Sequence, residues 1–232
     1  HNFTAEYDLN ENLLLKSITG YRTSTSGTGV HFGENVDFVS LDLTTFTPVI
    51  RNGAPFRASN VREHEQFTEE LQLNGQYGDK VAGGDRLTFT SGAYYFIEHG
   101  SERNPQNFIV GQNLSGIPGI GFPASNPFAY NTTTKSWAVF GQASYSPHIL
   151  DDRLRLTAGL RYSEDKKEVE RLRSDTVFVP AIAAGKAKFN AITYLAKAQY
   201  FFTDDLNAYI SYSKGYKAGS FNTRSANLEP YK

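Results

Sequence analysis

The sequence contains no cysteine and no methionine among its 232 residues, and it has a single tryptophan. Without cysteine, disulfide bonds and thiolate metal ligands are excluded, and a cysteine-free chain suits a protein that crosses an oxidising periplasm. The chain starts at His1 without a basic and apolar leader. Together with the absence of methionine, this start leads us to expect an internal segment of a longer protein.

Long apolar runs and an excess of one charge are also absent. No apolar run approaches the roughly 18 to 20 residues that a transmembrane helix needs. With 23 Lys and Arg against 24 Asp and Glu, the formal net charge is -1, so we expect no nucleic-acid partner. Aromatic residues are abundant, in contrast, with 14 Tyr and 17 Phe.

The hydrophobic pattern repeats every two residues, as it does in β-strands. From Leu154 to Tyr162, apolar and aromatic side chains alternate with arginine, threonine and glycine. Similar segments predict eight strands, at residues 2–7, 13–22, 61–77, 86–100, 135–146, 153–171, 189–202 and 206–221. The sequence therefore predicts an all-β fold.

The connections between these predicted strands are short and long in turn. Short links of turn residues lie at 8–12, 78–85, 147–152 and 203–205, and long links lie at 23–60, 101–134 and 172–188. Structureless links of such length are uncommon in compact soluble domains. Outer-membrane barrels, however, alternate tight periplasmic turns with long extracellular loops. The sequence thus predicts an antiparallel up-and-down meander of about eight strands, forming an open, incomplete part of a transmembrane outer-membrane β-barrel wall.

Aromatic side chains cluster near both ends of the predicted strands. Those near the short turns are Tyr7, Tyr77, Tyr145, Tyr200 and Phe202, and those near the long links are Tyr21, Tyr95, Tyr162, Tyr212 and Tyr216. On one strand, Trp137 and Tyr145 share a face and are separated by roughly 20 Å of barrel height. Aromatic residues favour strands in general, but their position at strand ends favours two interfacial girdles.

One face of each strand should contact lipid and the other should face the lumen. The predicted lipid-facing set, which should be exposed, is Leu87, Phe89, Val139, Leu154, Leu156, Leu160, Ala198 and Ile210. Arg155, Arg161 and Lys197 fall on the opposite face and should be partly shielded. Strand parity also places Glu69 on the lipid face, which is costly unless Glu69 lies near an interface or a bulge changes the parity.

We find no set of residues that indicates catalysis, a cofactor or a metal. The five histidines form no metal-binding pair, and Glu63, His64 and Glu65 are better explained as a solvated strand end. Glu69 and Glu70 point to opposite faces of a strand and cannot form a general acid–base pair. The charged run at residues 164–171 suits a solvated strand extension with cross-strand ion pairs. We therefore expect that the protein is not an enzyme.

Several segments resemble the barrel of TonB-dependent outer-membrane receptors. The most specific are LRLTAGLRYSEDKK at residues 154–167 and AYISYSKGYKAGSFN at residues 208–222, and SWAVFGQASY at residues 136–145 agrees with them. The resemblance implies a barrel of about 22 strands with an N-terminal plug. It implies active uptake of a scarce nutrient, such as a ferric siderophore, across the outer membrane of a Gram-negative bacterium. Residues 1–232 would be a partial barrel domain without the plug and the TonB box.

The partners follow from the same resemblance. They would be outer-membrane lipid and lipopolysaccharide, a siderophore or other small nutrient, and the TonB complex through the missing N-terminal region. A different class of function is a passive porin or a small self-contained eight-stranded outer-membrane barrel. The large predicted loops argue against so small a barrel, and plug and TonB-box sequence in the same gene would exclude it.

Three aromatic residues are candidates for ligand contact. Phe122, Phe128 and Tyr130 lie among glycine and proline in the predicted 101–134 loop, where stacking groups could capture a ligand. The alternative is that these loop aromatics pack on one another.

Overall fold

The computed structural model contains one antiparallel sheet of eight long strands and two small hairpins, and it describes residues 1–32, 36–42, 44–53, 56–111, 121–173, 183–224 and 228–231. The strands of the sheet are β1 (Asn2–Asn10), β2 (Leu13–Phe32), β5 (Phe56–Val81), β6 (Gly84–Gly111), β7 (Gly121–Tyr145), β8 (Leu154–Arg173), β9 (Ala183–Phe201) and β10 (Asn207–Lys214). The hairpins pair β3 (Val36–Asp42) with β4 (Thr47–Gly53), and β11 (Ser220–Phe221) with β12 (Pro230–Tyr231). A short 3-10 turn, η1, covers Leu150–Asp152. Among the described residues, no helix is long and apolar enough to cross a membrane.

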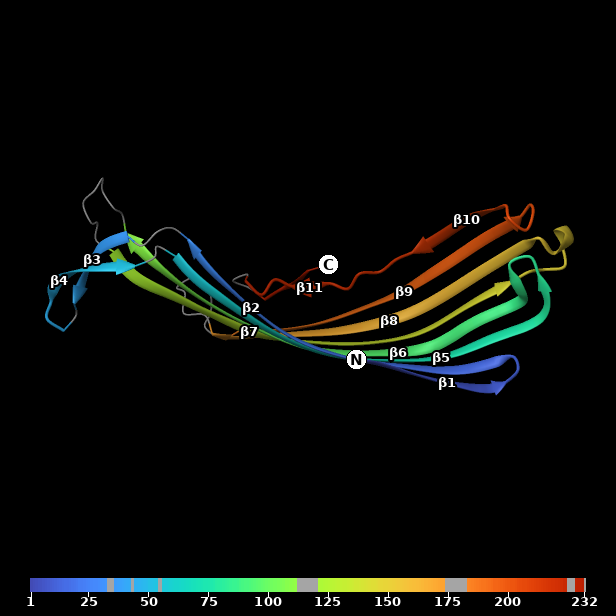
Figure 1. Ribbon diagram of the computed structural model, residues 1–232, viewed down its shortest axis with the longest axis horizontal. Coiled ribbons are helices and arrows are strands. Elements are labelled where there is room, and N and C mark those ends of the chain that lie inside the picture. Colours follow the sequence, from blue (N-terminus) through green and yellow to red (C-terminus); the bar gives the residue numbers. More distant parts are fainter. Residues whose placement is uncertain are drawn as a thin grey trace.

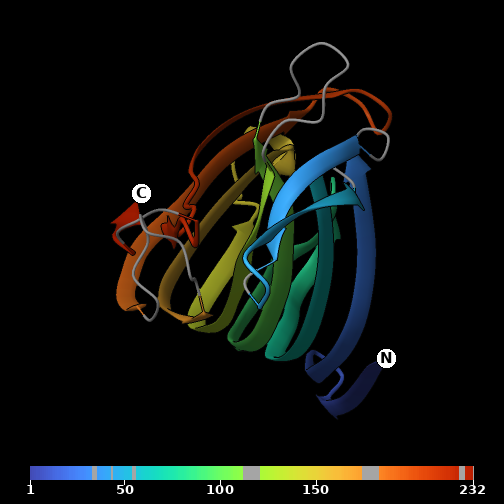
Figure 2. The same cartoon turned by 90° about the vertical axis from the view of Figure 1, so that its left-hand side faces the viewer.

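Neighbouring strands of the sheet pair antiparallel in the order β1-β2-β5-β6-β7-β8-β9-β10, so the predicted meander is confirmed. Within this described sheet, β1 and β10 are the two edges and do not pair with each other. The short turns lie at one end of the molecule and the β3–β4 hairpin at the other (Figure 1). Viewed from the hairpin end, the strands form an open arc (Figure 2). The sheet is therefore a curved wall that is not closed.

The strands extend much further than the sequence predicted. Residues 23–60, 101–134 and 172–188 were expected to be loops, but β2, β5, β6, β7, β8 and β9 all continue into them. The β6–β7 ladder, for example, runs from Leu87 opposite Tyr145 to Gly111 opposite Gly121. The predicted loops were too long. Backbone hydrogen bonds hold a strand ladder together, so threonine and serine can continue a strand where neither of its faces needs an apolar contact.

The last predicted strand is shorter than expected. The prediction ran over residues 206–221, but β10 ends at Lys214 and the chain then leaves the sheet. Tyr216, which was expected in the girdle near the long links, consequently lies off the strand and is half-buried. Gly219 permits this path, because a Cβ at that position would overlap the backbone of Tyr231 and the ring of Phe189.

The distribution of apolar and charged side chains is the reverse of that in a soluble protein. In the predicted lipid-facing set, Val139 is 48% exposed, Leu160 60% and Ile210 76%, and none of the set is buried. Arg155 and Lys197, on the opposite face, are half-buried. No dry core of leucines between stacked sheets is found in the described part of the chain. The outer face thus carries the apolar surface that lipid would cover.

The aromatic residues near the long-loop end form a diagonal line across the outer face. The line consists of Tyr21, Tyr95, Trp137, Tyr162, Tyr194 and Tyr212, and we call it the upper girdle. Tyr21 is level in register with Lys135 of β7, whereas Tyr212 is level with Ala143. This shift of about eight residues over six strand intervals corresponds to a strand tilt of about 40°, from about 3.3 Å per residue and 4.8 Å per strand. The girdle is therefore level when the strands have the tilt typical of membrane barrels.

Glu69 faces outward, as strand parity requires, and it is stabilised in two ways. It is opposite Tyr95 of β6, so it lies at the height of the upper girdle rather than in the apolar band. Its carboxylate accepts hydrogen bonds of 2.6 Å from the hydroxyl groups of both Ser17 and Thr19. The prediction of a position near the interface is confirmed, and no change of strand parity is needed at Glu69.

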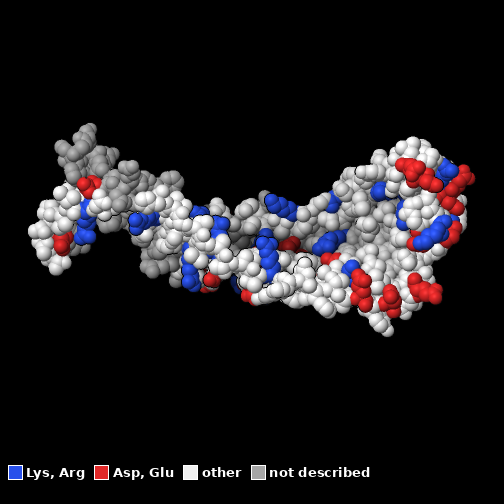
Figure 3. Space-filling view, in the orientation of Figure 1, with Lys and Arg blue, Asp and Glu red and all other residues white. Residues whose placement is uncertain are grey.

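A buried arginine connects two adjacent turns at the short-turn end. The Arg86 guanidinium donates hydrogen bonds of 2.6 and 2.8 Å to Asp79, and of 2.8 and 3.1 Å to Asp152. It also donates to the Ser146 carbonyl oxygen at 3.0 Å. Acidic side chains gather at this end of the molecule, while basic ones are mostly spread along its middle (Figure 3). Arg86 is therefore a cation that hydrogen bonds hold in place within this acidic end of the molecule.

A charge on the outer face should destabilise the protein only inside the apolar band. Ala158 lies midway between Leu154 and Tyr162 and is exposed. In the complete barrel, we expect Ala158→Arg to lower the free energy of unfolding from lipid vesicles by about 2–4 kcal/mol. Ile50→Arg, at an exposed position on the β3–β4 hairpin, should change it by less than about 0.5 kcal/mol. Equal effects of the two substitutions in a urea titration would contradict a membrane-facing wall.

The rim around Arg86 should make stability sensitive to acid. Hydrogen bonds from Arg86 lower the pKa of Asp79 to about 2 and hold the pKa of Asp152 below its usual range. Because a folded-state pKa below the unfolded value of about 3.9 stabilises only the ionised form, this stabilisation is complete above about pH 4 and is lost as pH falls towards 2. Arg86→Gln should lower the melting temperature by roughly several degrees at pH 7 and flatten its dependence on pH in that window. Lys80→Gln, which removes the exposed ion pair with Asp85, is the control and should leave the dependence unchanged.

Candidate ligand-binding wall

One row of side chains crosses the inner face of the sheet near its long-loop end. Arg62 of β5, Glu102 of β6, Tyr130 of β7 and Arg171 of β8 are consecutive partners in the strand register. Arg155 and Arg161 of β8 face inward, and Arg171 lies an even number of residues from them on the same strand, so it faces inward too. The other three residues are its successive cross-strand partners and therefore share its face. We call these four residues the inner row.

Glu102 is the centre of the inner row. Its side chain is buried, and it accepts hydrogen bonds from the Tyr130 hydroxyl at 2.6 Å and from Arg62 at 3.0 Å. A third donor is Arg224, from the segment that follows β10, at 3.1 Å. Burial raises the pKa of Glu102, but the hydrogen bonds from Tyr130 and the arginines outweigh it, so the net pKa is lowered. Glu102 is therefore an anion that joins two arginines and a tyrosine.

Two guanidinium groups contact the ring of Phe128, close to this carboxylate. Arg171 is 5.9 Å and Arg224 5.6 Å from the centre of its ring, and Tyr130 contacts the ring edge-on at 5.4 Å. Arg171 is fully buried and donates a hydrogen bond of 2.8 Å to the Thr223 carbonyl oxygen. Burial lowers the pKa of Arg171, although an arginine stays protonated at neutral pH. The stacking on Phe128 is the cation–π geometry expected for arginine.

The segment after β10 lies over this part of the inner face. Its described residues are 215–224 and 228–231, and we call it the inner strap. Besides Arg224, it contributes Phe221, whose ring packs beside Gly185 of β9, and Gly219, which packs against Phe189. Tyr216 lines a small polar depression with Tyr94 and Asp165. The strap thus crosses the wall from β9 to β6.

The structure brings two of the three predicted ligand-contact residues together. Phe128 and Tyr130 are neighbours on β7, whereas the sequence had placed all three at a loop apex, so that location is corrected to a strand. Phe128 is buried by its neighbours, and the Tyr130 hydroxyl is bonded to Glu102. Phe122 pairs with Val110 further along β7, and its side chain lies outside the described part.

The charged members of the site were not predicted. Glu102 falls in residues assigned to a loop, Arg62 lies at the very start of the predicted 61–77 strand, and Arg224 follows the last predicted strand. A signal was nevertheless present, because Arg62, Glu102 and Arg171 continue the inward parity of their strands without a break. Extending the period-two pattern of the predicted 86–100 strand to Glu102 would have placed it on the same face as Arg62 and Arg171.

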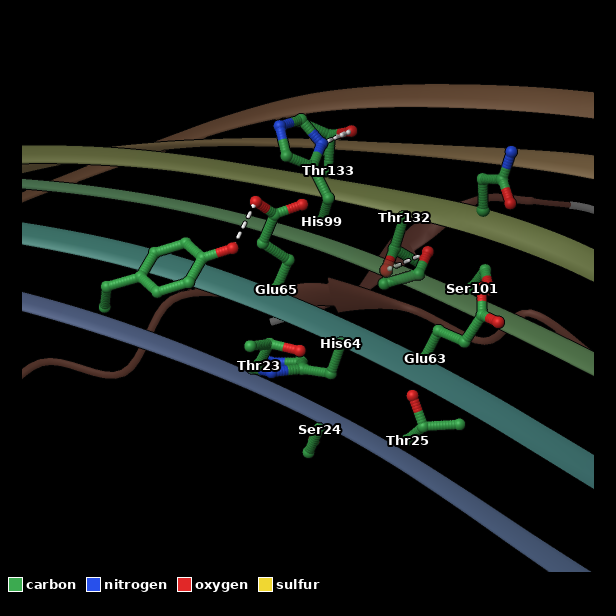
Figure 4. A pocket seen from close by; sticks show the side chains of 13 residues that line it. Thr23, Ser24, Thr25, Glu63, His64, Glu65, His99, Ser101, Thr132 and Thr133 are labelled. Atoms are coloured by element: carbon green, nitrogen blue, oxygen red, sulfur yellow. Dashed lines mark hydrogen bonds between the residues drawn. The ribbon is translucent and has the colours of Figure 1, made fainter. Parts of the chain in front are cut away.

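A second polar depression lies on the outer face of the long-loop end, just above the upper girdle. It has a volume of about 440 Å³, and we call it the outer groove (Figure 4). Its lining includes Tyr21, Glu65, His99 and Thr133. The Tyr21 hydroxyl donates to Glu65 at 2.9 Å, and His99 Nδ1 is 3.1 Å from the Thr133 hydroxyl. Within the described chain, no group of three histidine or acidic side chains is placed to hold a metal ion.

The chemistry of the inner row and strap is that of anion recognition. The guanidinium groups of Arg62 and Arg224 bind the Glu102 carboxylate, and the guanidinium group of Arg171 lies over the neighbouring Phe128 ring, so these four charged side chains have a net positive charge. Arginine presents several fixed donors that match carboxylate and phosphate oxygens. The aromatic rings beside them provide stacking surface.

The fold and its two faces define the class of the protein: a membrane β-barrel wall with an apolar exterior and a polar interior. The chain belongs to the TonB dependent receptor-like β-barrel family, whose model matches residues 1–232. Proteins of this family are outer-membrane receptors of Gram-negative bacteria, and they are transporters, not enzymes. The resemblance inferred from the sequence is thereby confirmed.

Solved structures share the fold at low sequence identity. The ferric yersiniabactin uptake receptor FyuA from Yersinia pestis matches 99% of this chain with 15% identity and a TM-score of 0.68. The siderophore receptor PiuA from Acinetobacter baumannii matches 91% with 18% identity and a TM-score of 0.61. The chain covers 30% and 31% of these two proteins, respectively. It therefore spans about a third of the length of the receptors that it resembles.

The contact between the inner strap and Glu102 can be tested directly. Glu102→Gln removes the charge that Arg224 and Arg62 share, and charged hydrogen bonds of this kind contribute about 1.5–3 kcal/mol. In the complete protein, we expect trypsin to cleave after Arg224 at least about tenfold faster in the Glu102→Gln variant than in the wild type. The released peptide is measured by mass spectrometry over time. Glu168→Gln, which removes an exposed pair with Lys186, should leave the rate unchanged. If both variants are cleaved at the wild-type rate, Glu102 does not hold the strap.

Proposed function

We propose that residues 1–232 form part of the barrel wall of an outer-membrane transporter that takes up a scarce nutrient, such as a ferric siderophore. The plug and the TonB-contacting segment would belong to other parts of the same protein. The observation that carries the proposal is the open eight-stranded wall with an exposed apolar outer face, in a chain that matches the receptor family throughout. This wall needs further strands to close into a barrel. The receptors that it resembles are about three times as long, which is enough chain for such strands.

The residues of the inner row and the inner strap support the proposal that the ligand is an anion. Their net positive charge comes from Arg62, Arg171 and Arg224, and Phe128 and Tyr130 lie beside them. A ferric siderophore with carboxylate or phenolate oxygens would match this combination of arginine and aromatic groups. The two structural neighbours named above are a ferric yersiniabactin uptake receptor and a siderophore receptor, which is consistent with that class of ligand.

A passive porin or a self-contained eight-stranded barrel is less favoured. A self-contained barrel would need β1 to pair with β10, and in the described sheet these strands are separate edges. A porin needs an open lumen, whereas the inner strap lies across the inner face of this wall and is bound to β6 and β8 through Glu102 and Arg171.

The proposal predicts uptake that depends on energy supplied through TonB. A strain producing the full-length protein should accumulate a radiolabelled ferric siderophore from a nanomolar external concentration, and deletion of TonB should lower this accumulation at least about tenfold. The measurement uses a panel of ferric siderophores and a strain that lacks its other siderophore receptors. Accumulation that persists without TonB would indicate a passive pore instead. Binding without any uptake in either strain would contradict a transport role.

A further inference from the structure

The inner face of the wall has a polar depression below the inner row, towards the short-turn end. It has a volume of about 390 Å³, and we call it the inner depression. β8 contributes Arg161, Asp165 and Lys167, which lie an even number of residues apart and therefore share the inner face. The rest of the lining comes from β6, β7 and the inner strap, which contributes Tyr216. A depression of this size can hold a small molecule.

Arg161 is oriented in the inner depression by contacts that leave most of its donors available. Its guanidinium lies 5.5 Å from the ring centre of Tyr94 and 5.4 Å from that of Phe140. Its Nε donates a hydrogen bond of 3.1 Å to the Ser163 hydroxyl. A guanidinium has five N–H donors, and in the described part of the chain neither Arg161 nor Lys167 forms an ion pair. The two cations can therefore bind an anion without first losing a carboxylate partner.

Asp165 adds a hydrogen-bond acceptor to the same depression. Its carboxylate accepts a hydrogen bond from the Ser136 hydroxyl, and an ionised carboxylate has lone pairs for further donors. Burial, followed by the Asp165 carboxylate, raises the pKa of Tyr216 to about 12, so the Tyr216 hydroxyl keeps its proton. Among the described residues, that buried hydroxyl has no acceptor in hydrogen-bond geometry. The inner depression can therefore bind hydroxyl groups as well as an anion.

These groups favour a ligand that is both anionic and hydroxylated. The two cations Arg161 and Lys167, with the one anion Asp165, have a net charge of +1, which matches one carboxylate. Asp165 needs a donor from the ligand, because two facing anions repel each other. A ferric complex whose oxygen atoms are all bound to iron as anions has no such donor. A neutral sugar has donors, but it leaves the positive charge unpaired.

An aromatic ring adds an apolar surface to the inner depression. Phe96 of β6 lines it together with Tyr94, and both side chains are half-buried. A sugar ring has a face of C–H groups that can pack on such a ring while its hydroxyls reach the polar groups around it. The inner depression thus combines an apolar surface, two cations, a carboxylate and a hydroxyl.

We propose that the inner depression binds a polyhydroxylated carboxylate, the chemistry of a sugar acid, as part of the transported nutrient. Arg161 and Lys167 bind its carboxylate. Asp165 and the Tyr216 hydroxyl bind its hydroxyl groups, and Phe96 packs on its carbon skeleton. This inference rests on the proposed transport function and names the chemical group that the wall selects. The group can belong to a free sugar acid or to a hydroxylated part of a ferric siderophore.

The test measures binding to the complete receptor, purified in a neutral detergent, by isothermal titration calorimetry. The probes are a disaccharide that ends in glucuronic acid, the same disaccharide ending in glucose, and a ferric tris-catecholate complex. The wild-type protein should bind the glucuronic acid probe at least about tenfold more tightly than either of the other two, because only this probe supplies both an anion and hydroxyl donors.

Two variants separate recognition of the carboxylate from recognition of the hydroxyls. Lys167→Gln should weaken binding of the glucuronic acid probe at least about fivefold and leave the glucose probe unchanged. Asp165→Asn should weaken both sugar probes at least about fivefold and should not weaken the ferric complex. The control is Lys197→Gln, on the same face but outside the inner depression, which should change none of the three affinities. Lys167 forms no ion pair in the described chain, so its replacement should not disturb folding.

Three results would overturn the proposal. The first is equal affinity of the wild-type protein for the glucuronic acid and glucose probes, and the second is wild-type affinity for all probes in both variants. The third is the absence of binding of either sugar probe, which would mean that another part of the complete protein fills the inner depression.

Uptake experiments distinguish the two sources of the group. If the nutrient is a free sugar acid, cells with the full-length protein should accumulate the radiolabelled glucuronic acid probe in a TonB-dependent manner. If the group belongs to a ferric siderophore, the probe should inhibit uptake of that siderophore without accumulating itself. Neither accumulation nor inhibition would contradict the proposal.

The binding and uptake measurements also separate this site from the proposed function. If uptake does not depend on TonB but the purified protein keeps its preference for the glucuronic acid probe, the transport proposal is wrong and the binding site remains. If uptake depends on TonB but the Lys167→Gln and Asp165→Asn variants bind all probes like the wild type, only the assignment of the inner depression is wrong.

Discussion

The backbone hydrogen bonds between neighbouring strands are the interaction on which the whole wall depends. In hydrocarbon an unpaired N–H or C=O group costs several kcal/mol, so each strand must be paired throughout the apolar band. Antiparallel pairing fixes the register, and the register fixes which side chains face outward. The apolar outer face, the line of the upper girdle and the inner row are all consequences of this single alternation. A slip of β7 by one residue, for example, would exchange lipid-facing Val139 for its inward neighbours.

The part of the fold inside the membrane was predictable because two different environments act on alternate residues there. The eight strands, their order, and the outward direction of Leu160 and Ile210 follow from that alternation. Beyond the girdle both faces meet water, and the contrast between alternate residues fades. The sequence then resembles that of a loop, rich in threonine, serine and glycine, although the ladders of β6 and β7 continue. Side-chain pattern predicts strands only where the two faces differ.

The candidate ligand-binding wall was harder to predict for a related reason. Phe128 and Tyr130 could be selected as aromatic residues in a region of special composition, and they do lie together. Glu102 and Arg224 are 122 residues apart in the chain, and their contact depends on the path of the inner strap after β10. No local pattern specifies that path. It follows from tertiary contacts, such as those of Gly219 with Phe189, that become visible only once the sheet is assembled.

The early end of β10 shows where the demand for pairing stops. Lys214 is only two residues beyond Tyr212, so β10 ends just as it leaves the hydrocarbon, while β9 continues upward to Ala183. Above that level, water and headgroups can satisfy a free strand edge, which hydrocarbon cannot. Strand length in the upper wall is therefore free to change by insertion or deletion during evolution, whereas length within the bilayer is not. Receptors of this kind can acquire a new extracellular surface without altering the part of the barrel that the membrane constrains.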